Sequence, residues 1–476
     1  MRRALDSFFV FVVALALFTL FAQRTVYGVD GWVLLRRLSS GDLRSEMHLA
    51  FKPVAYVLIR VGESFGMSLY QAAVAACAAC TAVGVALMHA ALRVLGGSRR
   101  DGFLVAAGVA LCPGVFFFAT VLERHGVFFL GAGLAALASA WFARRPSVGS
   151  AAAAGAAIVA AYALHSTGAF LTTIDLPLAV ALARILDPTR SWSRLLGLGG
   201  ISFVVAAIGC VLARKAAVLL GLVEQEGASF EFFLVHAKAH LAHPEMIAGA
   251  LWQEVVLPFL PFSIFWLAIR RAPSRSAAAA TGVGVIAYGL LSYLMLGDFG
   301  ERGAYSLPLA LPFVALTLTA LGRRFGSLSI LLAAVLAISE IRNHDQHPTG
   351  AIAQGIRELA GERPFLLPAA PIDFETIYVD FPGLRPTEDY WDAFDAKGFH
   401  GTLVRDNAAF LTGGYLGQKA SSGRILLMSA SAVAELEKPV DPGQAGPLVL
   451  EVLRERFRFE PVHVAGFEGF RLVPRP

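Results

Sequence analysis

The sequence is poor in charged residues. Only 16% of its 476 residues are Asp, Glu, Lys or Arg, whereas a soluble domain carries roughly 25%. Hydrophobic residues make up 56% of the chain, and the mean hydropathy is +0.63. This balance excludes an ordinary soluble domain and places the chain among multi-pass membrane proteins.

Cysteine is also scarce, and all four cysteines fall within apolar runs: Cys77, Cys80, Cys112 and Cys210. The sequence therefore predicts no disulfide framework, and the Cys77–Cys80 pair has no second pair of ligands to complete a metal site. The net charge of +5 does not indicate nucleic-acid binding, because the basic residues form no contiguous stripe.

Long apolar runs dominate the first 341 residues. A membrane-spanning helix needs about 20 apolar residues, and by this criterion we predict about eleven spans. They lie near 7–23, 69–95, 102–119, 126–143, 150–164, 168–186, 195–220, 251–269, 277–296, 304–321 and 326–341. The first is interpreted as a retained helix rather than a signal peptide, because no clear small-x-small cleavage site precedes Arg24. The short fifth and sixth spans are compatible with one bent hairpin.

Arginine clusters mark the ends of these runs. Five are adjacent pairs and the sixth is looser: Arg2–Arg3, Arg99–Arg100, Arg144–Arg145, Arg270–Arg271, Arg323–Arg324, and Arg184 with Arg190 and Arg194. Because cytoplasmic loops hold positive charge, eleven spans with a cytoplasmic N-terminus would leave every cluster inside and the C-terminus outside. We therefore expect a bacterial inner-membrane protein whose remaining loops face the periplasm.

Two domains are predicted, with a boundary where the composition changes at about residue 342. Residues 1–341 form an all-α membrane domain, and its amphipathic segment 27–68 is expected to lie at the outer membrane surface. Residues 342–476 are polar and punctuated by Pro and Gly, and their short apolar runs predict a soluble, periplasmic α/β domain.

Three candidates for chemistry precede the second span. Asp30 follows the first span directly, and two interpretations fit it equally: a general base for an acceptor hydroxyl, or the N-cap of a helix. His48 and Lys52 follow, and an imidazole and an ammonium at the outer surface suit a phosphate. A Lys52 that reaches out to the lipid headgroups is the alternative.

Other ionisable residues lie in short loops between apolar runs. Glu123, Arg124 and His125 join the third and fourth spans, where charged groups are costly unless they are paired, so they form either a functional site or an ion pair at the headgroups. His165 and Asp175 flank the short hairpin. Asp175 is expected to be protonated, or paired with His165 or with an arginine.

Two later segments complete the candidate set. His236, His240 and His243 would share one face of a helix, as weak metal ligands or as the polar face of an interfacial helix. Arg302 precedes the tenth span on the predicted outer side, where positive charge departs from the orientation rule. A guanidinium there suits a lipid phosphate.

In this order, these segments resemble the C-type (GT-C) integral-membrane glycosyltransferases, particularly the protein O-mannosyltransferase and aminoarabinose-transferase branch. An early Asp is matched by Asp30, an HxxxxPxxY stretch by residues 48–56, and an acid after a PxxxxxA segment by residues 113–123. A His in the next hairpin is matched by His165, and an RY-LP-like stretch by residues 302–308 with two residues inserted. One departure is that Gly31 and Trp32 follow Asp30, where many members carry a second acid.

The resemblance implies an inverting transfer of a sugar from a polyprenyl-phosphate carrier at the outer membrane face. It implies Asp30 as the catalytic base, and Arg302 with Lys52 as ligands of the carrier phosphate. Glu123 and His165 would line the pocket, and His48 and Tyr305 complete the substrate-binding candidates. Independently of the resemblance, such chemistry needs only a base, one or two cations and a membrane groove, because the lipid phosphate is already a leaving group.

The expected partners are a polyprenyl-phosphate-linked sugar donor, membrane lipids and an envelope acceptor of unknown identity, with no nucleic acid. No cofactor is required, and a divalent metal is left open. Two other functions were weighed. A transporter or flippase for an envelope lipid predicts inverted repeats and ionisable groups at mid-membrane, and no repeat was found. A non-catalytic scaffold predicts that Asp30 is dispensable.

Overall fold

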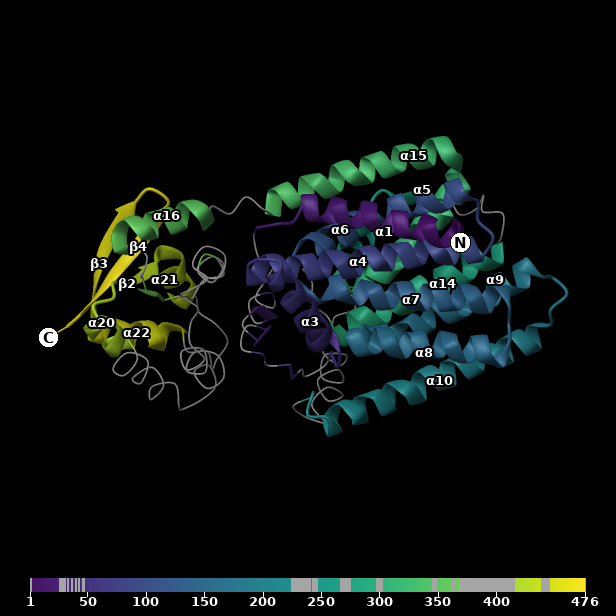
Figure 1. Ribbon diagram of the computed structural model, residues 1–476, viewed down its shortest axis with the longest axis horizontal. Helices are drawn as coiled ribbons and strands as arrows, with labels where there is room; N and C mark the ends of the chain where they lie inside the picture. The colour runs from purple at the N-terminus through teal and green to yellow at the C-terminus, as the bar shows by residue number, and fades with distance from the viewer. Residues whose placement is uncertain are drawn as a thin grey trace. The chain divides into compact units, whose positions relative to one another are not determined.

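The computed structural model describes residues 2–24, 31, 34–35, 37–38, 41, 43–44, 48–223, 241, 247–265, 275–296, 303–344, 349–361, 365–367, 373, 376, 416–437 and 446–475. The chain divides into two compact units. One comprises residues 1–23 and 34–343, and the other comprises residues 24–33 and 344–476. The first unit is helical, and the second contains a four-stranded sheet (Figure 1).

The first unit is that of a multi-pass membrane protein. Six helices are long and apolar enough to cross a membrane: α1 (Arg2–Leu20), α4 (Leu69–Val94), α7 (Arg124–Arg144), η1 with α9 (Ser166–Thr173 and Asp175–Leu186), α10 (Trp192–Leu219) and the second half of α15 (Ala310–His344). The helices α5 (Arg99–Ala110) and α6 (Pro113–Thr120) are bent by 65° and add a seventh span if counted together. The predicted number of about eleven is thus not confirmed over the described residues.

The differences from the predicted spans have local causes. Helix α8 (Val148–Leu164) has only 17 residues, and α14 (Arg275–Leu296) contributes a shorter apolar stretch. The predicted eighth span is broken into α12 (Ile247–Leu251), the π-helical turn η3 (Trp252–Val256), η4 (Leu257–Phe259) and α13 (Phe262–Phe265). Pro258 and Pro261 fall in this stretch, and proline cannot donate the hydrogen bond that continues a helix.

Helix α15 is continuous in its hydrogen bonding but sharply bent. A Cβ built on Gly326 would lie 3.8 Å from the Cα atom of Leu318, although eight residues of straight helix span about 12 Å. The two predicted spans 304–321 and 326–341 therefore correspond to the two arms of one bent helix, preceded by η6 (Ala304–Leu309).

Serine residues define where several helices begin. Ser68, Ser98, Ser147 and Ser191 precede α4, α5, α8 and α10, and each side chain accepts a hydrogen bond from a backbone N–H in the first turn. The first turn of a helix leaves its N–H groups without partners, and a serine oxygen satisfies one of them. These caps fix the helix starts within otherwise uniformly apolar sequence.

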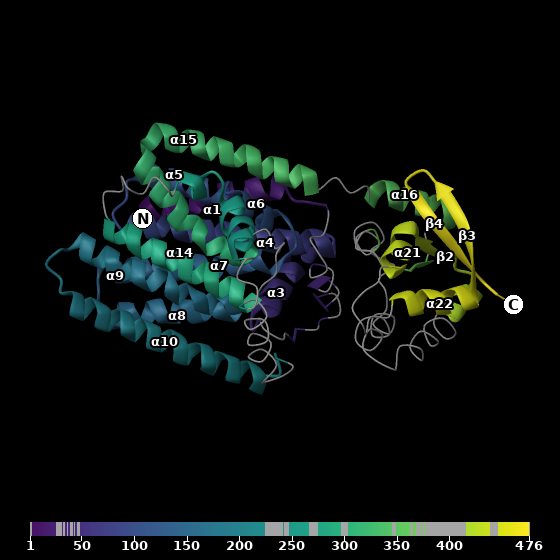
Figure 2. The ribbon, with the colours of Figure 1, turned by 180° about the vertical axis from the view of Figure 1, so that it is seen from behind.

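A row of neighbouring helices forms the body of the first unit, in the order α1, α4, α7, α8 and α10 (Figure 1). Seen from behind, α9 and α14 cover the other side of this row (Figure 2). Helices α4 and α7 approach so closely that a Cβ on Gly133 would lie 2.6 Å from the carbonyl oxygen of Gly84. Close contact through small residues is typical of packing within membranes.

Helices α4 and α7 also run parallel, because Gly126 meets Cys77 and Gly133 meets Gly84. Their C-terminal ends therefore share one end of the unit. Near the end of α4 lie the starts of α1 and α5, joined by an ion pair of 2.9 Å between Arg99 and Asp6. The described arginine clusters thus gather at one end, called here the basic end.

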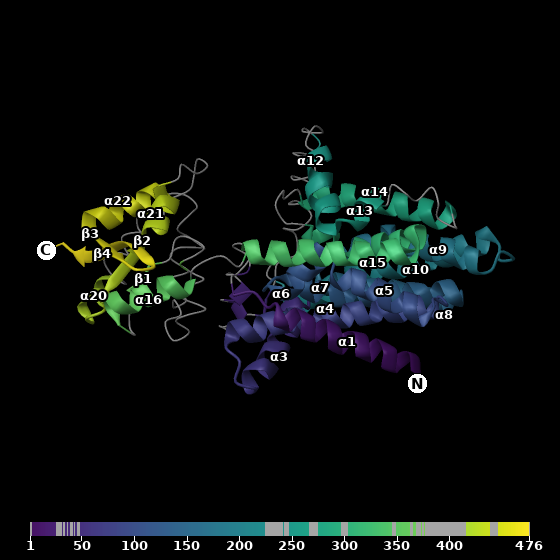
Figure 3. The same ribbon diagram turned by 90° about the horizontal axis from the view of Figure 1, so that it is seen from above.

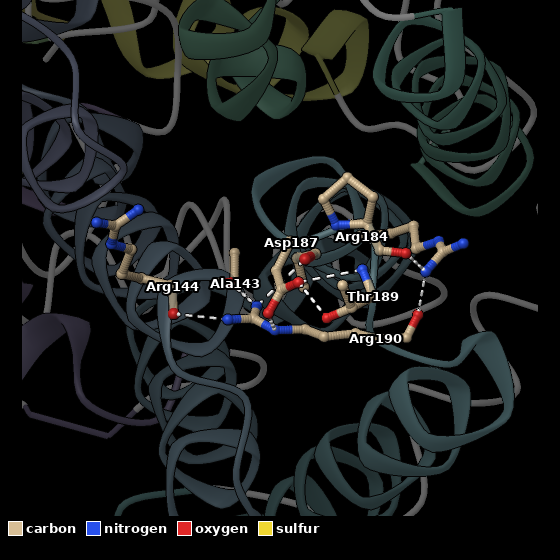
Figure 4. Close-up of polar contacts among 8 residues, drawn as sticks. Ala143, Arg144, Arg184, Asp187, Thr189 and Arg190 are labelled. Atoms are coloured by element: carbon tan, nitrogen blue, oxygen red, sulfur yellow. Dashed lines mark hydrogen bonds and ion pairs between the residues drawn. The ribbon is translucent and has the colours of Figure 1, made fainter.

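The loop between α9 and α10 closes the basic end of α7 (Figure 4). Arg190 donates to the carbonyl oxygens of Ala143 at 3.1 Å and Arg144 at 3.4 Å, the last carbonyls of α7. It also pairs with Asp187 at 3.1 Å, and Asp187 accepts from the hydroxyl of Thr189 at 2.6 Å. A guanidinium at the carbonyl end of a helix satisfies unpaired acceptors and its dipole.

The segment before α4 contains α3 (Phe51–Ser64), within the stretch expected to lie at the membrane surface. Its buried face contains Phe51, Ala55 and Ile59, while Val57 and Val61 are exposed. Helix α3 packs on α4, so one face is held by the protein and the other presents apolar side chains outward.

The second unit contains a mixed sheet of order β1-β2-β4-β3, made of Phe365–Leu366, Leu426–Ser429, Phe467–Pro474 and Phe457–Val464 respectively. Strand β1 is parallel to β2, and the other neighbours are antiparallel. Figure 3 shows α21 (Ala430–Glu437) and α22 (Gly446–Arg456) on one face of the sheet and α16 (Thr349–Ala360) on the other. The predicted α/β character of this region is confirmed, and its core joins Ile356 to Leu366, Leu427 and Phe467.

Candidate active site

A cluster of buried polar side chains lies at the N-terminal end of α7, opposite the basic end. Its members are His48, Glu123, Arg124, His125 and His165. Glu123 is 2% exposed, and the imidazoles are buried to a similar degree. Polar groups buried in this way are expensive unless they are paired or serve a function.

Backbone contacts bring these distant segments together. The N–H of Ala50 donates to the carbonyl oxygen of Ala163 at 2.6 Å, which ties the chain after His48 to the end of α8. The turn after His165 is equally tight, because a Cβ on Gly168 would lie 2.3 Å from the backbone nitrogen of Tyr162. Only glycine fits there, and the turn sets His165 beside His48.

Glu123 is the centre of charge in the cluster. It precedes the first residue of α7, and its Oε1 atom lies 3.3 Å from Nε of Arg124 and 3.3 Å from Nδ1 of His125. Burial alone raises the pKa of Glu123, but Arg124 and His125 outweigh it and lower the pKa below its ordinary value. The carboxylate is therefore ionised, and the predicted Glu–Arg pair exists in a buried setting.

The three imidazoles stack rather than converge. The rings of His48 and His165 are 4.1 Å apart and nearly parallel, and the ring of His125 lies 4.6 Å from that of His165. Tyr305 closes the stack, with its ring edge-on to His125 at 4.9 Å. Among the residues that the structure describes, no group of three or more His, Cys, Asp or Glu side chains has the arrangement of a metal site.

His48 is held neutral by its neighbours. The N–H of Ser166 donates to its Nδ1 atom at 3.3 Å, and the guanidinium of Arg124 lies 2.9 Å from its Nε2 atom. A neutral imidazole has one nitrogen that accepts, and an imidazolium has none, so two donors disfavour protonation. In the same direction, burial and then the Arg124 guanidinium lower the pKa of His48 well below 6.5.

His165 caps the turn that it begins. Its Nδ1 atom accepts from the N–H of Thr167 at 3.3 Å and lies 2.8 Å from the Thr167 hydroxyl. Because Nδ1 accepts, the ring proton resides on Nε2 in the neutral form. Burial and then the neighbouring His48 lower the pKa of His165 well below 6.5.

Two partly buried contacts hold the stretch that carries Tyr305. Glu254, in the π-helical turn η3, accepts from the N–H of Gly303 at 2.7 Å. The hydroxyl of Tyr288, on α14, donates to the carbonyl oxygen of Tyr305. These contacts position the start of η6 against the histidine stack.

The structure describes five of the predicted site residues and brings four of them into one cluster. His165 contacts both His48 and Tyr305 through its ring, and Glu123 joins them through His125. Lys52 is buried in the first turn of α3 and donates to the carbonyl oxygen of Arg44. Four predictions lie outside the described residues: Asp30, Arg302, the histidines His236, His240 and His243, and the helix proposed to carry them.

Asp175 stands apart from the cluster. Its Oδ2 atom is buried, and no described residue forms a hydrogen bond with it. The predicted pairing with His165 is not seen, because the Nδ1 atom of His165 is engaged by Thr167 and neither its Nε2 atom nor Oδ2 of Asp175 has a hydrogen-bond partner among the described residues.

Three contributors to the site were not among the predicted site residues. Arg124 and His125 were predicted with Glu123 to form a functional site or an ion pair but were not assigned to substrate binding, and Thr167 was not considered. The signal for Arg124 and His125 was present, because ionisable groups between apolar helices are candidates by default. Thr167 offered none, since a threonine beside a glycine turn is common in any loop.

Comparisons with known proteins support the fold. No family model matches the chain, and no curated protein matches it. A crystal structure of ArnT from Cupriavidus metallidurans bound to undecaprenyl phosphate aligns with a TM-score of 0.54 and 16% identity, over 97% of each chain. The apo form of the same protein aligns with a TM-score of 0.48 and 17% identity, also over 97% of each chain. The chain therefore shares the fold of the ArnT structure.

Proposed function

We propose that the protein is a glycosyltransferase that moves a sugar from a polyprenyl-phosphate carrier to an envelope acceptor. One observation carries the proposal. The segments that resemble the GT-C motifs, around His48, Glu123, His165 and Tyr305, meet in one buried cluster on an ArnT-like fold. A fold alone does not specify an activity, and the cluster supplies the local chemistry.

The carrier is proposed from two lines of support. The ArnT structure is bound to undecaprenyl phosphate, and the cluster lies in a chain with many apolar helices, where a polyprenyl tail is soluble. Lys52 and Arg302 are the proposed ligands of the carrier phosphate. Lys52 would exchange its hydrogen bond to the Arg44 carbonyl for one to a phosphate oxygen.

The proposed reaction is an inverting displacement. The acceptor oxygen forms a bond to the anomeric carbon while the bond from that carbon to the phosphate oxygen breaks, and the electron pair leaves with the phosphate. Asp30 takes the proton from the acceptor hydroxyl, and the cations stabilise the charge on the departing phosphate. His48, Glu123, His165 and Tyr305 position the sugar.

We place this site at the periplasmic face of a bacterial inner membrane. The support is that the described arginine clusters share one end of the first unit and the histidine cluster lies at the other. Positive charge favours the cytoplasmic side. The N-terminus would then be cytoplasmic, and the domain of residues 342–476 periplasmic.

The test is to delete the gene and complement it with wild-type protein or Asp30→Asn at matched expression, measuring envelope glycans by mass spectrometry. A glycan that disappears on deletion and is restored by wild type but not by Asp30→Asn supports the transferase, and its mass identifies the sugar. Full restoration by Asp30→Asn would remove Asp30 from the mechanism. No glycan change on deletion would favour a transporter or a scaffold. Treatment with EDTA tests for a divalent metal.

A further inference from the structure

Glu123 and His165 each hold one buried atom that has no hydrogen-bond partner among the described residues. The two atoms are Oε2 of Glu123 and Nε2 of His165. An unpaired buried polar atom costs about 1–3 kcal/mol, and such atoms are rare in native proteins. Here two occur in one cluster, linked through His125, whose ring lies 4.6 Å from His165 and whose Nδ1 atom lies 3.3 Å from Glu123.

The two atoms have opposite hydrogen-bonding roles. The Nδ1 atom of His165 accepts from the Thr167 N–H, so Nε2 carries the proton and is a donor. The carboxylate of Glu123 shares its Oε1 atom with Arg124 and His125, so Oε2 is an acceptor. The cluster therefore presents one unused donor and one unused acceptor.

The formal charge of the cluster is already balanced. Glu123 is paired with Arg124, and His48 and His165 are held neutral by the donors and the burial around them. A phosphate would meet the Glu123 carboxylate, and an ammonium group would meet an N–H that it cannot accept from. A hydroxyl group donates one hydrogen bond and accepts others, so it fits both atoms without adding charge.

We infer that His165 and Glu123 together bind a neutral hydroxyl group of the substrate, with His165 Nε2–H donating to it and Glu123 Oε2 accepting from it. This inference rests on the proposed function and narrows the substrate to one that presents an uncharged hydroxyl at this subsite. The hydroxyl belongs either to the donor sugar or to an acceptor alcohol. The experiment below separates these sources.

The substitution His165→Asn removes the proposed substrate contact and the ring that packs against His48 and His125, but keeps the cap of the turn. The Asn Oδ1 atom occupies the place of Nδ1 and accepts from the Thr167 N–H, and Asn is among the best helix caps. His165→Gln is the converse variant. Its side-chain amide N–H reaches the position of Nε2 and can still donate to the substrate hydroxyl. His89→Asn is the matched control, since His89 is also buried and its Nδ1 atom also contacts a hydroxyl, that of Ser7 at 2.9 Å, near the basic end.

The experiment measures binding of undecaprenyl phosphate, undecaprenyl phosphate glucose, undecaprenyl phosphate mannose and undecaprenyl phosphate aminoarabinose to the full chain in nanodiscs. For a donor-sugar hydroxyl, wild type binds a neutral glycoside more tightly than the bare carrier. His165→Asn then weakens glycoside binding about tenfold and leaves carrier binding unchanged. In His165→Gln and in His89→Asn, the neutral glycoside should still bind more tightly than the bare carrier.

Other outcomes are equally decisive. If glycoside binding is unchanged in His165→Asn but this variant fails to restore the envelope glycan, the hydroxyl belongs to the acceptor. If His165→Asn changes neither binding nor glycan restoration, a water molecule satisfies the two atoms in place of a substrate hydroxyl, and the inference is wrong. A preference for aminoarabinose that His165→Asn does not alter would also overturn it. If wild type restores no glycan and binds no carrier, the proposed function fails, and the inference fails with it.

Discussion

The two ends of helix α7 both hold polar clusters, but the clusters differ in kind. At the basic end, Arg190 meets the last carbonyls of α7 and the carboxylate of Asp187, in partly exposed positions (Figure 4). At the other end, Glu123 and the histidines are buried, and Oε2 of Glu123 and Nε2 of His165 lack partners among the described residues. The first cluster completes a helix, and the second retains unused hydrogen-bonding capacity.

This contrast distinguishes structural polar groups from functional ones. A partly exposed ion pair at the end of a helix costs little desolvation free energy and contributes little to stability. A buried cluster with unpaired atoms lowers the stability of the protein. Proteins keep such groups chiefly where they serve binding or catalysis. Each of the following predictions compares a variant in the buried cluster at the N-terminal end of α7 with a variant elsewhere. They are given from the largest expected effect to the smallest.

The largest effect is expected for Glu123→Leu. This substitution leaves the guanidinium of Arg124, which is 18% exposed, without its carboxylate. Removing one partner of a buried pair costs about 3–5 kcal/mol. We expect a large loss of thermal stability in detergent, measured by the loss of monodisperse protein on heating. Asp187→Leu, at the basic end, should cost about 1 kcal/mol or less. Equal losses in the two variants would contradict the comparison.

A smaller effect is expected for Gly168→Ala. The added Cβ would lie 2.3 Å from the backbone nitrogen of Tyr162, so the turn that carries His165 must move. Overpacking of this kind costs about 1–3 kcal/mol, and transfer activity should fall with it. The control is Gly197→Ala in α10, where a Cβ meets open space. There we expect a gain of about 0.5–1 kcal/mol, measured in the same melting experiment.

Acid should destabilise the buried cluster at the N-terminal end of α7 before the basic end. The pKa of His48 is lowered below 6.5 in the folded protein, so the unfolded chain binds more protons and stability falls as the pH drops below 6.5. The slope is about 1.4 kcal/mol per pH unit for one histidine. Asp187 has a pKa lowered from 3.8 by Thr189, so its contribution is lost only at lower pH.

The variant that tests this slope is His48→Gln, whose amide oxygen can accept from Arg124. Melting temperatures measured between pH 5 and pH 7 should show a shallower pH dependence in His48→Gln than in wild type. The variant Asp187→Asn should leave the slope in this range unchanged. An identical slope in His48→Gln and wild type would mean that His48 is not held neutral by folding.

The smallest effect is expected for Arg190→Ala. It removes donors to the carbonyls of Ala143 and Arg144, which water then solvates. Loss of such a contact at a partly exposed helix end costs about 0.3–1 kcal/mol. Hydrogen exchange should increase only in the last turn of α7 and in the loop before α10. Exchange that spreads to residues 123–125 would show that the two ends are coupled.

Much of this arrangement follows from sequence patterns. Apolar runs predicted α4, α8 and α10 closely, because hydropathy acts within one segment, and the serine caps that fix their starts are local as well. The short apolar runs of the second unit, at 364–367, 376–379, 424–428 and 467–473, likewise predicted β2 and β4. Strand β3 was missed, since Pro461 and charged residues obscure its pattern, and such residues are tolerated only at the edge of a sheet.

The candidate site was predicted less completely, for a physical reason. Each motif residue was visible in its own segment, but the stacking of His48 on His165 depends on the Ala50–Ala163 hydrogen bond and on the tight turn at Gly168. Contacts between distant segments have no local pattern. The span count was less accurate for the same reason, because the break at 251–265 and the bend at Gly326 depend on how the segments pack.

The most direct test of the central claim compares Glu123→Gln with Asp187→Asn, one conservative substitution at each end of α7. Each variant is expressed at matched level in cells that lack the gene, and envelope glycans are measured by mass spectrometry. We predict that Asp187→Asn restores the glycan and that Glu123→Gln does not. Restoration by Glu123→Gln together with failure of Asp187→Asn would place the functional site at the basic end and contradict this account.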